Sequence, residues 1–212
     1  MIVTVLGDIH GNLPALERVL EAELAGTDQW ICHGDVVNYG PWSNECVHLL
    51  ETIPNTVRLV GNHEIYFLSG TYPGSHPVAR LFFEHCFPDF TAFDEIGRYQ
   101  ASYKVGDFLI QHTLEDRYLY LDTPVHIEQN CIVGHSHHQF ERAVDGFRLY
   151  NTGSVGQNRI HINVINYLQI DTVSGLCKFK AIIYDVDCVI NEMKARKYPK
   201  VCIEYYQRKP RA

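Results

Sequence analysis

Five short motifs dominate this sequence, and each follows an apolar stretch that is typical of a buried β-strand. Each motif places aspartate, histidine or asparagine beside a glycine or at the end of its strand. Because strand ends converge on one edge of a sheet in alternating α/β folds, we expect the motifs to meet there. Glycine lets the backbone turn sharply enough for the next side chain to face a common centre. The motifs are Gly7-Asp8-Ile9-His10-Gly11-Asn12, Gly34-Asp35, Gly61-Asn62-His63-Glu64, Gln111-His112 and Gly134-His135-Ser136-His137.

The side chains of these motifs predict a metal centre. Carboxylates, imidazoles and an amide together suit divalent first-row metals better than the all-oxygen sites of calcium. Seven candidate ligands exceed what one ion takes from a protein while positions stay open for water. Two ions that share a carboxylate account for this number, at a separation of about 3.5–4 Å. The candidates are Asp8, His10, Asp35, Asn62, His112, His135 and His137.

Strands and helices are predicted to alternate in the first half of the chain. Asn12 is a candidate N-cap for the first helix, and Pro14 stands in the first turn of that helix. Ser75 and Pro77 mark the start of a later helix. The predicted strands span residues 2–7, 30–33 and 57–60, and the predicted helices span residues 13–24 and begin near residues 43 and 77.

The second half of the chain is rich in predicted strands. Gly106-Asp107 and Asp145-Gly146 are typical of tight hairpin turns. A final helix is predicted over residues 186–197 and is expected to stop at Pro199. The strands are predicted at residues 101–105, 108–112, 131–134, 142–144, 147–150, 164–170 and 177–183. Strand–helix units followed by hairpins predict an α/β or α+β fold, with two packed sheets and helices outside.

Length and composition fit one globular domain over residues 1–212. No apolar run approaches the roughly 18 residues of a membrane span. The residues before the first motif are too few for a signal peptide, so a cytoplasmic location is expected. Residues 66–101 are rich in aromatic side chains and contain prolines at positions 73, 77 and 88. This segment is either a cap that selects substrate or a structural helical insert.

The formal net charge of −7 argues against a broad nucleic-acid-binding surface, which needs basic residues. The seven cysteines are scattered without a C-x-x-C pair, so we interpret them as small buried hydrophobic residues. An acidic chain that binds an anionic substrate needs a concentrated source of positive charge. The twelve histidines are unusual for this length, and cations bound by them would supply that charge.

The order of the motifs, D-x-H, G-D, G-N-H-[DE], H and G-H-x-H, resembles the calcineurin-like metallophosphoesterase superfamily. The stretches GDVVNYGP at residues 34–41, NTGSVGQ at residues 151–157 and YDVD at residues 184–187 are similar to its small bacterial and archaeal phosphodiesterase branch. The resemblance implies a four-layer αββα sandwich, in which two mixed β-sheets are flanked by helices. Members of this branch often form homo-oligomers, so the protein is either a monomer or a homo-oligomer.

The resemblance also implies how the candidate ligands divide between two divalent ions. Manganese is the expected metal, with iron, nickel, cobalt and zinc as alternatives. One ion would be held by Asp8, His10, Asp35 and His137, and the other by Asp35, Asn62, His112 and His135. Asp35 would bridge the two ions. A hydroxide between them would attack phosphorus, so no nucleophilic side chain is implied.

His63 and Glu64 have separate implied roles. His63 would lie beside the leaving-group oxygen as proton donor or electrostatic stabiliser, and Glu64 would orient it. A histidine suits this task because its pKa lies near the operating pH, and a carboxylate partner favours its charged form.

Four residues outside the ligand set are candidate substrate contacts. Asn12 is either only an N-cap or also a substrate contact. Asn38 and Tyr39 either shape their loop or line a pocket, and Arg159 either lies at the surface or binds phosphate.

These features predict a metal-dependent phosphoesterase that hydrolyses phosphodiesters or phosphomonoesters of small molecules or nucleotides, without a membrane partner. A dinucleoside polyphosphate hydrolase, a nuclease and a non-catalytic metal-binding scaffold of the same fold are the alternatives. The presence of His63 favours an enzyme over a scaffold, and the negative charge counts against a nuclease.

Overall fold

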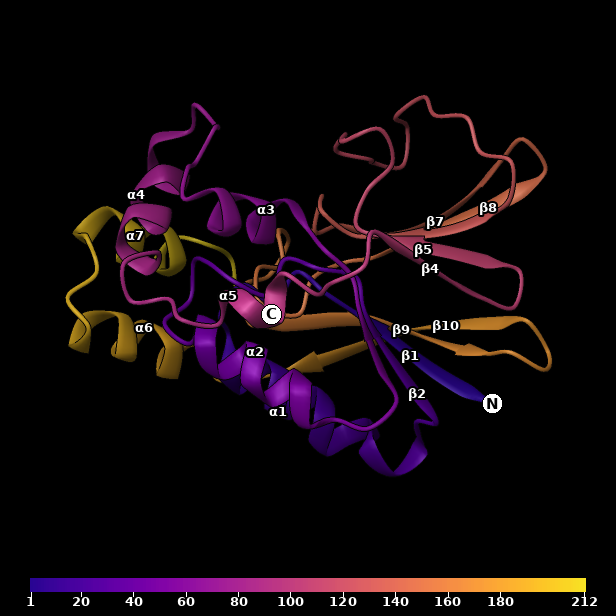
Figure 1. Cartoon of the computed structure of the whole chain (residues 1–212), viewed down its shortest axis with the longest axis horizontal. Coiled ribbons are helices and arrows are strands. Elements are labelled where there is room, and N and C mark those ends of the chain that lie inside the picture. Colours follow the sequence, from indigo (N-terminus) through magenta and orange to yellow (C-terminus); the bar gives the residue numbers. More distant parts are fainter.

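Two five-stranded β-sheets pack face to face in the computed structural model, which describes residues 1–212 (Figure 1). The strands of the first sheet are β1 (Ile2–Leu6), β2 (Gln29–Cys32), β3 (Thr56–Arg58), β9 (Val164–Asp171) and β10 (Leu176–Ile183). The strands of the second sheet are β4 (Ser102–Val105), β5 (Phe108–Gln111), β6 (Asn130–Val133), β7 (Gln139–Val144) and β8 (Phe147–Thr152). Their order is β10-β9-β1-β2-β3 in the first sheet and β4-β5-β6-β8-β7 in the second.

Each sheet contains three neighbouring parallel strands. β1, β2 and β3 are parallel in the first sheet, and β5, β6 and β8 are parallel in the second. The remaining strand pairs are antiparallel, so both sheets are mixed, as predicted. Each of the five motifs follows one of these parallel strands, and β8 leads into residues 153–157. Because parallel strands end at one edge of their sheet, this topology places the motifs together.

An apolar layer between the sheets holds them together. Val5 and Ile31 of the first sheet and Ile110 and Ile132 of the second are fully buried in this layer. β1 is also covered on its other face, where Leu6 packs into the larger core beneath the helices. This double burial explains why the first strand is almost continuously apolar rather than alternating.

The helices cover the outer face of the first sheet and the region beyond the strand ends (Figure 1). They are α1 (Leu13–Glu23), the 3₁₀ turn η1 (Leu24–Gly26), α2 (Ser43–Thr52), α3 (Asn62–Ser69), α4 (Pro77–Cys86), α5 (Phe93–Ile96), α6 (Asp187–Ala195) and α7 (Lys200–Gln207). α1 and α2 lie along the first sheet, and α4, α6 and α7 gather on the left of the view. No helix combines the length and apolarity that a membrane crossing needs.

The outer face of the second sheet is covered by a loop instead of helices. Leu119 and Ile127, from the connection between β5 and β6, pack against Val133 and Leu149. The two mixed sheets flanked by helices confirm the predicted fold. The covering layer on this side, however, contains no helix between residues 113 and 129.

Two predictions about helices were wrong. The helix predicted over residues 186–197 is not the last one, because α7 follows it after a short turn. Pro199 is the N-cap of α7 and does not merely stop α6. Proline is well suited to a helix start because the amide hydrogen that it lacks has no partner there. The sequence reasoning also missed α3, which begins inside the Gly61 motif and whose Glu64 closes a capping interaction with the Gly61 amide.

A buried carboxylate at the end of α1 joins that helix to the first sheet. Glu23 is only 8% exposed. Its oxygens accept hydrogen bonds from the Tyr167 hydroxyl at 2.6 Å and Gln169 Nε2 at 2.7 Å, and pair with Lys180 Nζ at 2.7 Å. Burial opposes ionisation, but Lys180 and the two other donors outweigh it and lower the pKa of Glu23.

We expect Glu23→Gln to lower the free energy of unfolding at neutral pH by about 1–3 kcal/mol, because Lys180 loses its carboxylate partner. Since the pKa of Glu23 is lower in the folded state, this stabilisation is present above the ordinary pKa of 4.5 and disappears as the pH falls through the lowered value. Urea denaturation of both proteins over a descending pH series tests this. Glu21→Gln is the control, because its side chain is 63% exposed. Equal destabilisation by both substitutions would contradict the prediction.

Candidate metal centre

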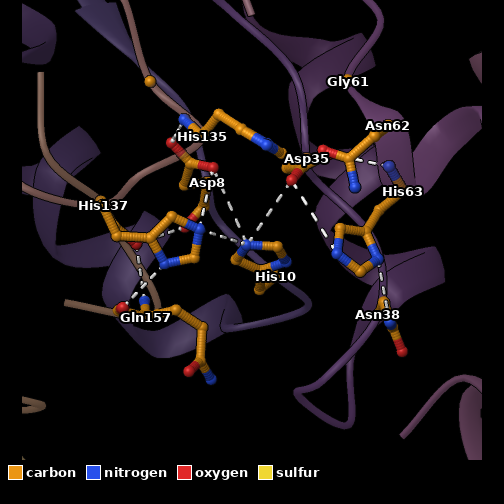
Figure 2. Close-up of polar contacts among 12 residues, drawn as sticks. Asp8, His10, Asp35, Asn38, Gly61, Asn62, His63, His135, His137 and Gln157 are labelled. Carbon is orange, nitrogen blue, oxygen red and sulfur yellow. Dashed lines mark hydrogen bonds and ion pairs between the residues drawn. The ribbon is translucent and has the colours of Figure 1, made fainter. Parts of the chain in front are cut away.

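Backbone hydrogen bonds join the loops that follow the parallel strands. The amide of Asp8 donates to the carbonyl of Gly34 at 2.9 Å, and the amide of His10 donates to the carbonyl of Asp35 at 2.9 Å. The amide of His135, which follows β6 of the second sheet, donates to Asp8 Oδ2 at 2.9 Å. The edges of both sheets therefore meet at a single point, and the side chains of the motifs turn toward it (Figure 2).

The first group of candidate ligands gathers around His10. His10 Nε2 lies 3.1 Å from His137 Nε2, 3.8 Å from Asp8 Oδ1 and 3.8 Å from Asp35 Oδ2. His137 Nε2 lies 3.1 Å from Asp8 Oδ1. All four side chains are buried, and their ligand atoms lie within 4.8 Å of one another. These are the four residues that the family resemblance assigned to one ion.

The second group gathers around His112. Its Nε2 lies 3.0 Å from Asn62 Oδ1, 3.1 Å from His135 Nδ1 and 3.3 Å from Asp35 Oδ2. This is the set that the sequence assigned to the other ion. Asp35 Oδ2 contacts both groups, so its carboxylate lies between them (Figure 2).

The hydrogen bonds that three of the imidazoles make on the side away from the centre indicate that the two groups of side chains fit cations. The Nδ1 atoms of His10, His137 and His112 lie 3.3, 2.9 and 3.1 Å from the carbonyl oxygens of Val37, Gln157 and His33. A carbonyl oxygen can only accept, so each Nδ1 carries the hydrogen. In the neutral tautomer each Nε2 then presents a lone pair to the centre. Lone pairs that face one another at 3.1 Å are stable with a cation between them, and backbone carbonyls commonly orient metal-binding histidines in this way.

Two further observations support a fit to cations. Asp8 Oδ1 is buried and accepts no hydrogen bond, which is costly for a carboxylate oxygen without a cation beside it. The backbone also adopts an unfavourable conformation at five of the seven candidate ligands, which have positive φ angles between 49° and 66°. Such strain is concentrated at functional sites, where surrounding structure holds it in place. The five residues are Asp8, His10, Asp35, His135 and His137.

The pKa shifts agree with this arrangement. Burial and neighbouring positive groups hold the pKa of His10 and of His137 well below the usual range, which keeps both side chains neutral. Burial also opposes charge on His112, but the Asp35 carboxylate outweighs it and raises the pKa of His112 to about 9. A proton on His112 therefore compensates the charge of Asp35 when no other cation does.

His63 lies beside this centre, but Asn38 contacts its ring instead of the predicted Glu64. Its Nε2 lies 4.0 Å from Asp35 Oδ2, and its Nδ1 lies 2.9 Å from Asn38 Nδ2 (Figure 2). Glu64 does not orient His63, so that prediction was wrong. The Glu64 carboxylate accepts hydrogen bonds from the amides of Asp35, Val36, Val37 and Gly61, at 2.7–3.2 Å. A charged side chain one position further along a helix turns away from its neighbour, and here it reaches four backbone donors.

The four candidate substrate contacts lie in different surroundings. Asn12 is completely buried, caps α1 through the amide of Ala15, and donates to Tyr184 and the carbonyl of Gly156. All its polar side-chain atoms are thus used within the protein, which favours the N-cap alternative over a substrate contact. Asn38 is also fully buried and contacts His63. Tyr39 and Arg159, by contrast, line a pocket beside the centre.

Sequence reasoning missed several residues that build the centre. Gln157 supplies the carbonyl that orients His137, and its side chain donates to Tyr206 of α7. Ser154 Oγ donates to the carbonyl of Asp8 at 2.7 Å. The signal was the position of residues 153–157, which follow β8, the sixth of the parallel strands. The tyrosines of α7 gave no comparable signal, because they are far from every motif in sequence.

The comparisons with known proteins agree with this geometry. An uncharacterized protein of Methanocaldococcus jannaschii is 43% identical over 63 residues, which are 29% of this chain and 26% of that protein. A symmetrical bis(5'-nucleosyl)-tetraphosphatase of Thioalkalivibrio sulfidiphilus is 32% identical over 84 residues, which are 38% of this chain and 30% of that protein. The chain thus aligns with less than a third of either curated relative.

The whole fold is similar to a metallophosphoesterase from Sphaerobacter thermophilus. The TM-score is 0.77 at 23% sequence identity, and the similarity covers 98% of both chains. The sequence profile of the calcineurin-like phosphoesterase family matches residues 1–164. The match includes every strand-end motif, the whole second sheet, and β1, β2 and β3 of the first sheet. The chain therefore belongs to the calcineurin-like phosphoesterase family.

Proposed function

We propose that this protein is a metal-dependent phosphoesterase that hydrolyses small phosphate esters, nucleotides among them, at a dinuclear centre. The observation that carries this proposal is the pair of buried ligand groups that share Asp35, with His63 beside them. The family of the chain supports it, and so does the similarity to a symmetrical bis(5'-nucleosyl)-tetraphosphatase. That similarity makes dinucleoside polyphosphates the second candidate substrate class.

The centre would bind two divalent ions, with manganese as the expected metal. The first group would hold one ion, and the second group, with Asn62, would hold the other. Bound ions of this kind supply positive charge and Lewis-acid polarisation to a phosphoryl group. Without them the site is a cluster of buried carboxylates and neutral imidazoles, which does not favour an anionic substrate.

His63 would protonate the leaving group. Because Asn38 Nδ2 donates to His63 Nδ1, the hydrogen of the neutral imidazole is on Nε2, the atom that faces Asp35. In the proposed reaction, water adds its oxygen to phosphorus and the bond from phosphorus to the ester oxygen breaks. The Nε2 proton passes to the departing oxygen, and a proton from the water restores His63. Asn38 would act as a positioning residue that fixes the tautomer.

Arg159 would contact the phosphate. It is a half-buried cation that lines the pocket beside the centre, and the Tyr205 hydroxyl accepts a hydrogen bond from its Nη1. A guanidinium presents several donors in one plane and therefore suits phosphate oxygens.

The scaffold alternative is weaker, because a scaffold does not require a proton donor that is held beside the ligand groups.

Metal binding is the first test. We expect wild-type protein to bind two manganese ions, Asp8→Asn to lose about one of them, and Asp35→Asn to lose both, since Asp35 belongs to both groups. Equilibrium dialysis with elemental analysis measures the stoichiometry, and manganese should also raise the melting temperature of the wild type. Asp28→Asn, at a surface position outside the centre, is the control. Retention of both ions by Asp35→Asn would contradict a shared carboxylate.

Turnover tests the role of His63. The manganese-loaded protein should hydrolyse p-nitrophenyl phosphate or bis-p-nitrophenyl phosphate, and His63→Ala should lower kcat by about 10²–10⁴-fold through loss of the proton donor. Bound manganese should remain unchanged in this variant, because His63 is not a proposed ligand. His48→Ala, at an exposed position of α2, is the matched control. If the wild type is no faster than His63→Ala, the proposed activity is wrong.

Asn38 has a distinct expected effect. Asn38→Ala should lower kcat by about 10–100-fold, the usual range for a residue that orients a functional histidine, while KM and bound manganese change little. Steady-state kinetics on one ester, with metal analysis of the same samples, separate these quantities. A variant that loses metal, or one that changes only KM, would show that Asn38 does not position His63.

A further inference from the structure

A pocket of about 190 Å³ opens beside the candidate metal centre, and four of its eight lining residues are tyrosines. We call it the tyrosine pocket. Its walls come from five segments: the loop after β2, the segment that includes α4, the β5–β6 connection, the β8–β9 connection, and helix α7. The lining residues are Tyr39, Tyr72, His76, Val78, Ala79, Tyr118, Arg159 and Tyr205. No acidic side chain is among them, so the pocket does not repel an anion.

The tyrosine pocket directly adjoins the candidate ligands. The ring of Tyr118 stacks on His135, with 4.1 Å between the ring centroids and 26° between the planes. The ring of Tyr39 contacts His10 edge-on at 4.9 Å and His63 at 5.4 Å. A group bound in the pocket therefore lies next to the point where a phosphoryl group would react.

The tyrosine rings offer surfaces on which an aromatic ring of a ligand can stack. Tyr118 is 55% exposed, although it stacks on a buried histidine, so one face of its ring is open to solvent. The half-buried rings of Tyr72 and Tyr205 stand on the other walls. Exposed aromatic side chains beside a charged site are typical of binding surfaces, and base–tyrosine stacking is worth about 1–3 kcal/mol per base.

The volume of the tyrosine pocket and the charge of Arg159 limit which ligands it can bind. The volume is below the roughly 300–1,000 Å³ of pockets that enclose a drug-sized ligand, so it suits one ring system. Arg159 stands in the same pocket, where its charge can pair with a phosphate attached to that ring system through a sugar.

We propose that the tyrosine pocket is a nucleobase subsite, so that the protein selects nucleoside phosphates over phosphate esters without an aromatic ring. Tyr118 and Tyr72 stack on the base, Tyr205 fixes Arg159, and Arg159 binds the phosphate at the mouth of the metal centre. This inference rests on the proposed function and adds its substrate class. It also gives residues 66–101 and α7 a shared role as the selecting walls.

A matched pair of ligands tests the subsite. Adenosine 5'-monophosphate and ribose 5-phosphate carry the same sugar and phosphate, and only the first has a base. In manganese-loaded His63→Ala protein, which should not consume the ligands, we expect the first to bind about 5- to 150-fold more tightly by calorimetry. Tyr118→Leu should remove most of this preference and leave the affinity for ribose 5-phosphate unchanged. Tyr120→Leu, 41% exposed and outside the pocket, should keep the preference.

A second measurement separates this proposal from the proposed function. Adenosine, which lacks phosphate, should bind the metal-free protein weakly, and Tyr72→Leu should weaken that binding further. Equal affinity for the two phosphates in the unsubstituted pocket would overturn the subsite, while hydrolysis of p-nitrophenyl phosphate by the wild type would leave the proposed function intact. If the preference depends on Tyr118 but the manganese-loaded wild type hydrolyses none of these esters, the subsite is supported and the proposed function is overturned.

Discussion

The buried negative charge of Asp35 is the constraint on which the rest of the site depends. Its Oδ1 accepts from the amide of His63 at 2.9 Å, and its Oδ2 faces His10 and His112. A second buried carboxylate, Glu64, accepts from the Asp35 amide itself. Burial and the charge of Asp35 raise the pKa of Glu64 to about 7. Two adjacent carboxylates in a dry interior are costly unless donors or cations surround them. Backbone amides of the Asp35 and Gly61 loops donate to both of these carboxylates.

The unfavourable backbone conformations follow from the same constraint. The candidate ligands approach from two sheets, so each loop must turn within one or two residues of its strand. Gly34 can do this because its φ of 106° suits glycine alone, and a Cβ there would lie 2.4 Å from the amide nitrogen of Gly61. Asp8 and His135 have no such freedom and adopt positive φ angles. Their hydrogen bond, at 2.9 Å, joins the two sheets and offsets part of the strain.

The sequence predicted the parts of this protein that depend on local pattern. Apolar strands that end in glycine and a candidate ligand were found at nearly correct bounds. The side chains that the family resemblance assigned to each ion lie close together in space, and ion binding by them stays a prediction. Contacts between distant segments were not predictable in this way. Glu64 was expected to contact its neighbour, but its helix turns it toward the backbone of the Asp35 loop. Tyr205 lies in a helix that was not predicted, because the last helix was expected to end at Pro199. No local pattern indicated that Tyr205 would contact Arg159.

Helix α7 lines the proposed nucleobase subsite through Tyr205 but contributes no candidate ligand. The candidate ligands are held by backbone carbonyls and by loops within residues 1–164, the part that the family shares. α7 lies outside that range, yet Tyr206 binds the side chain of Gln157, whose carbonyl orients His137. Lys209 lies 3.3 Å from Gln157 Oε1, and burial together with Arg159 lowers the pKa of Lys209 to about 7. The side chains of α7 and of the residues after it are not candidate ligands, so substitutions among them can change the pocket and its charge without removing a ligand. They meet the centre through Gln157 and also through Tyr205, whose ring centroid lies 6.3 Å from that of Tyr39.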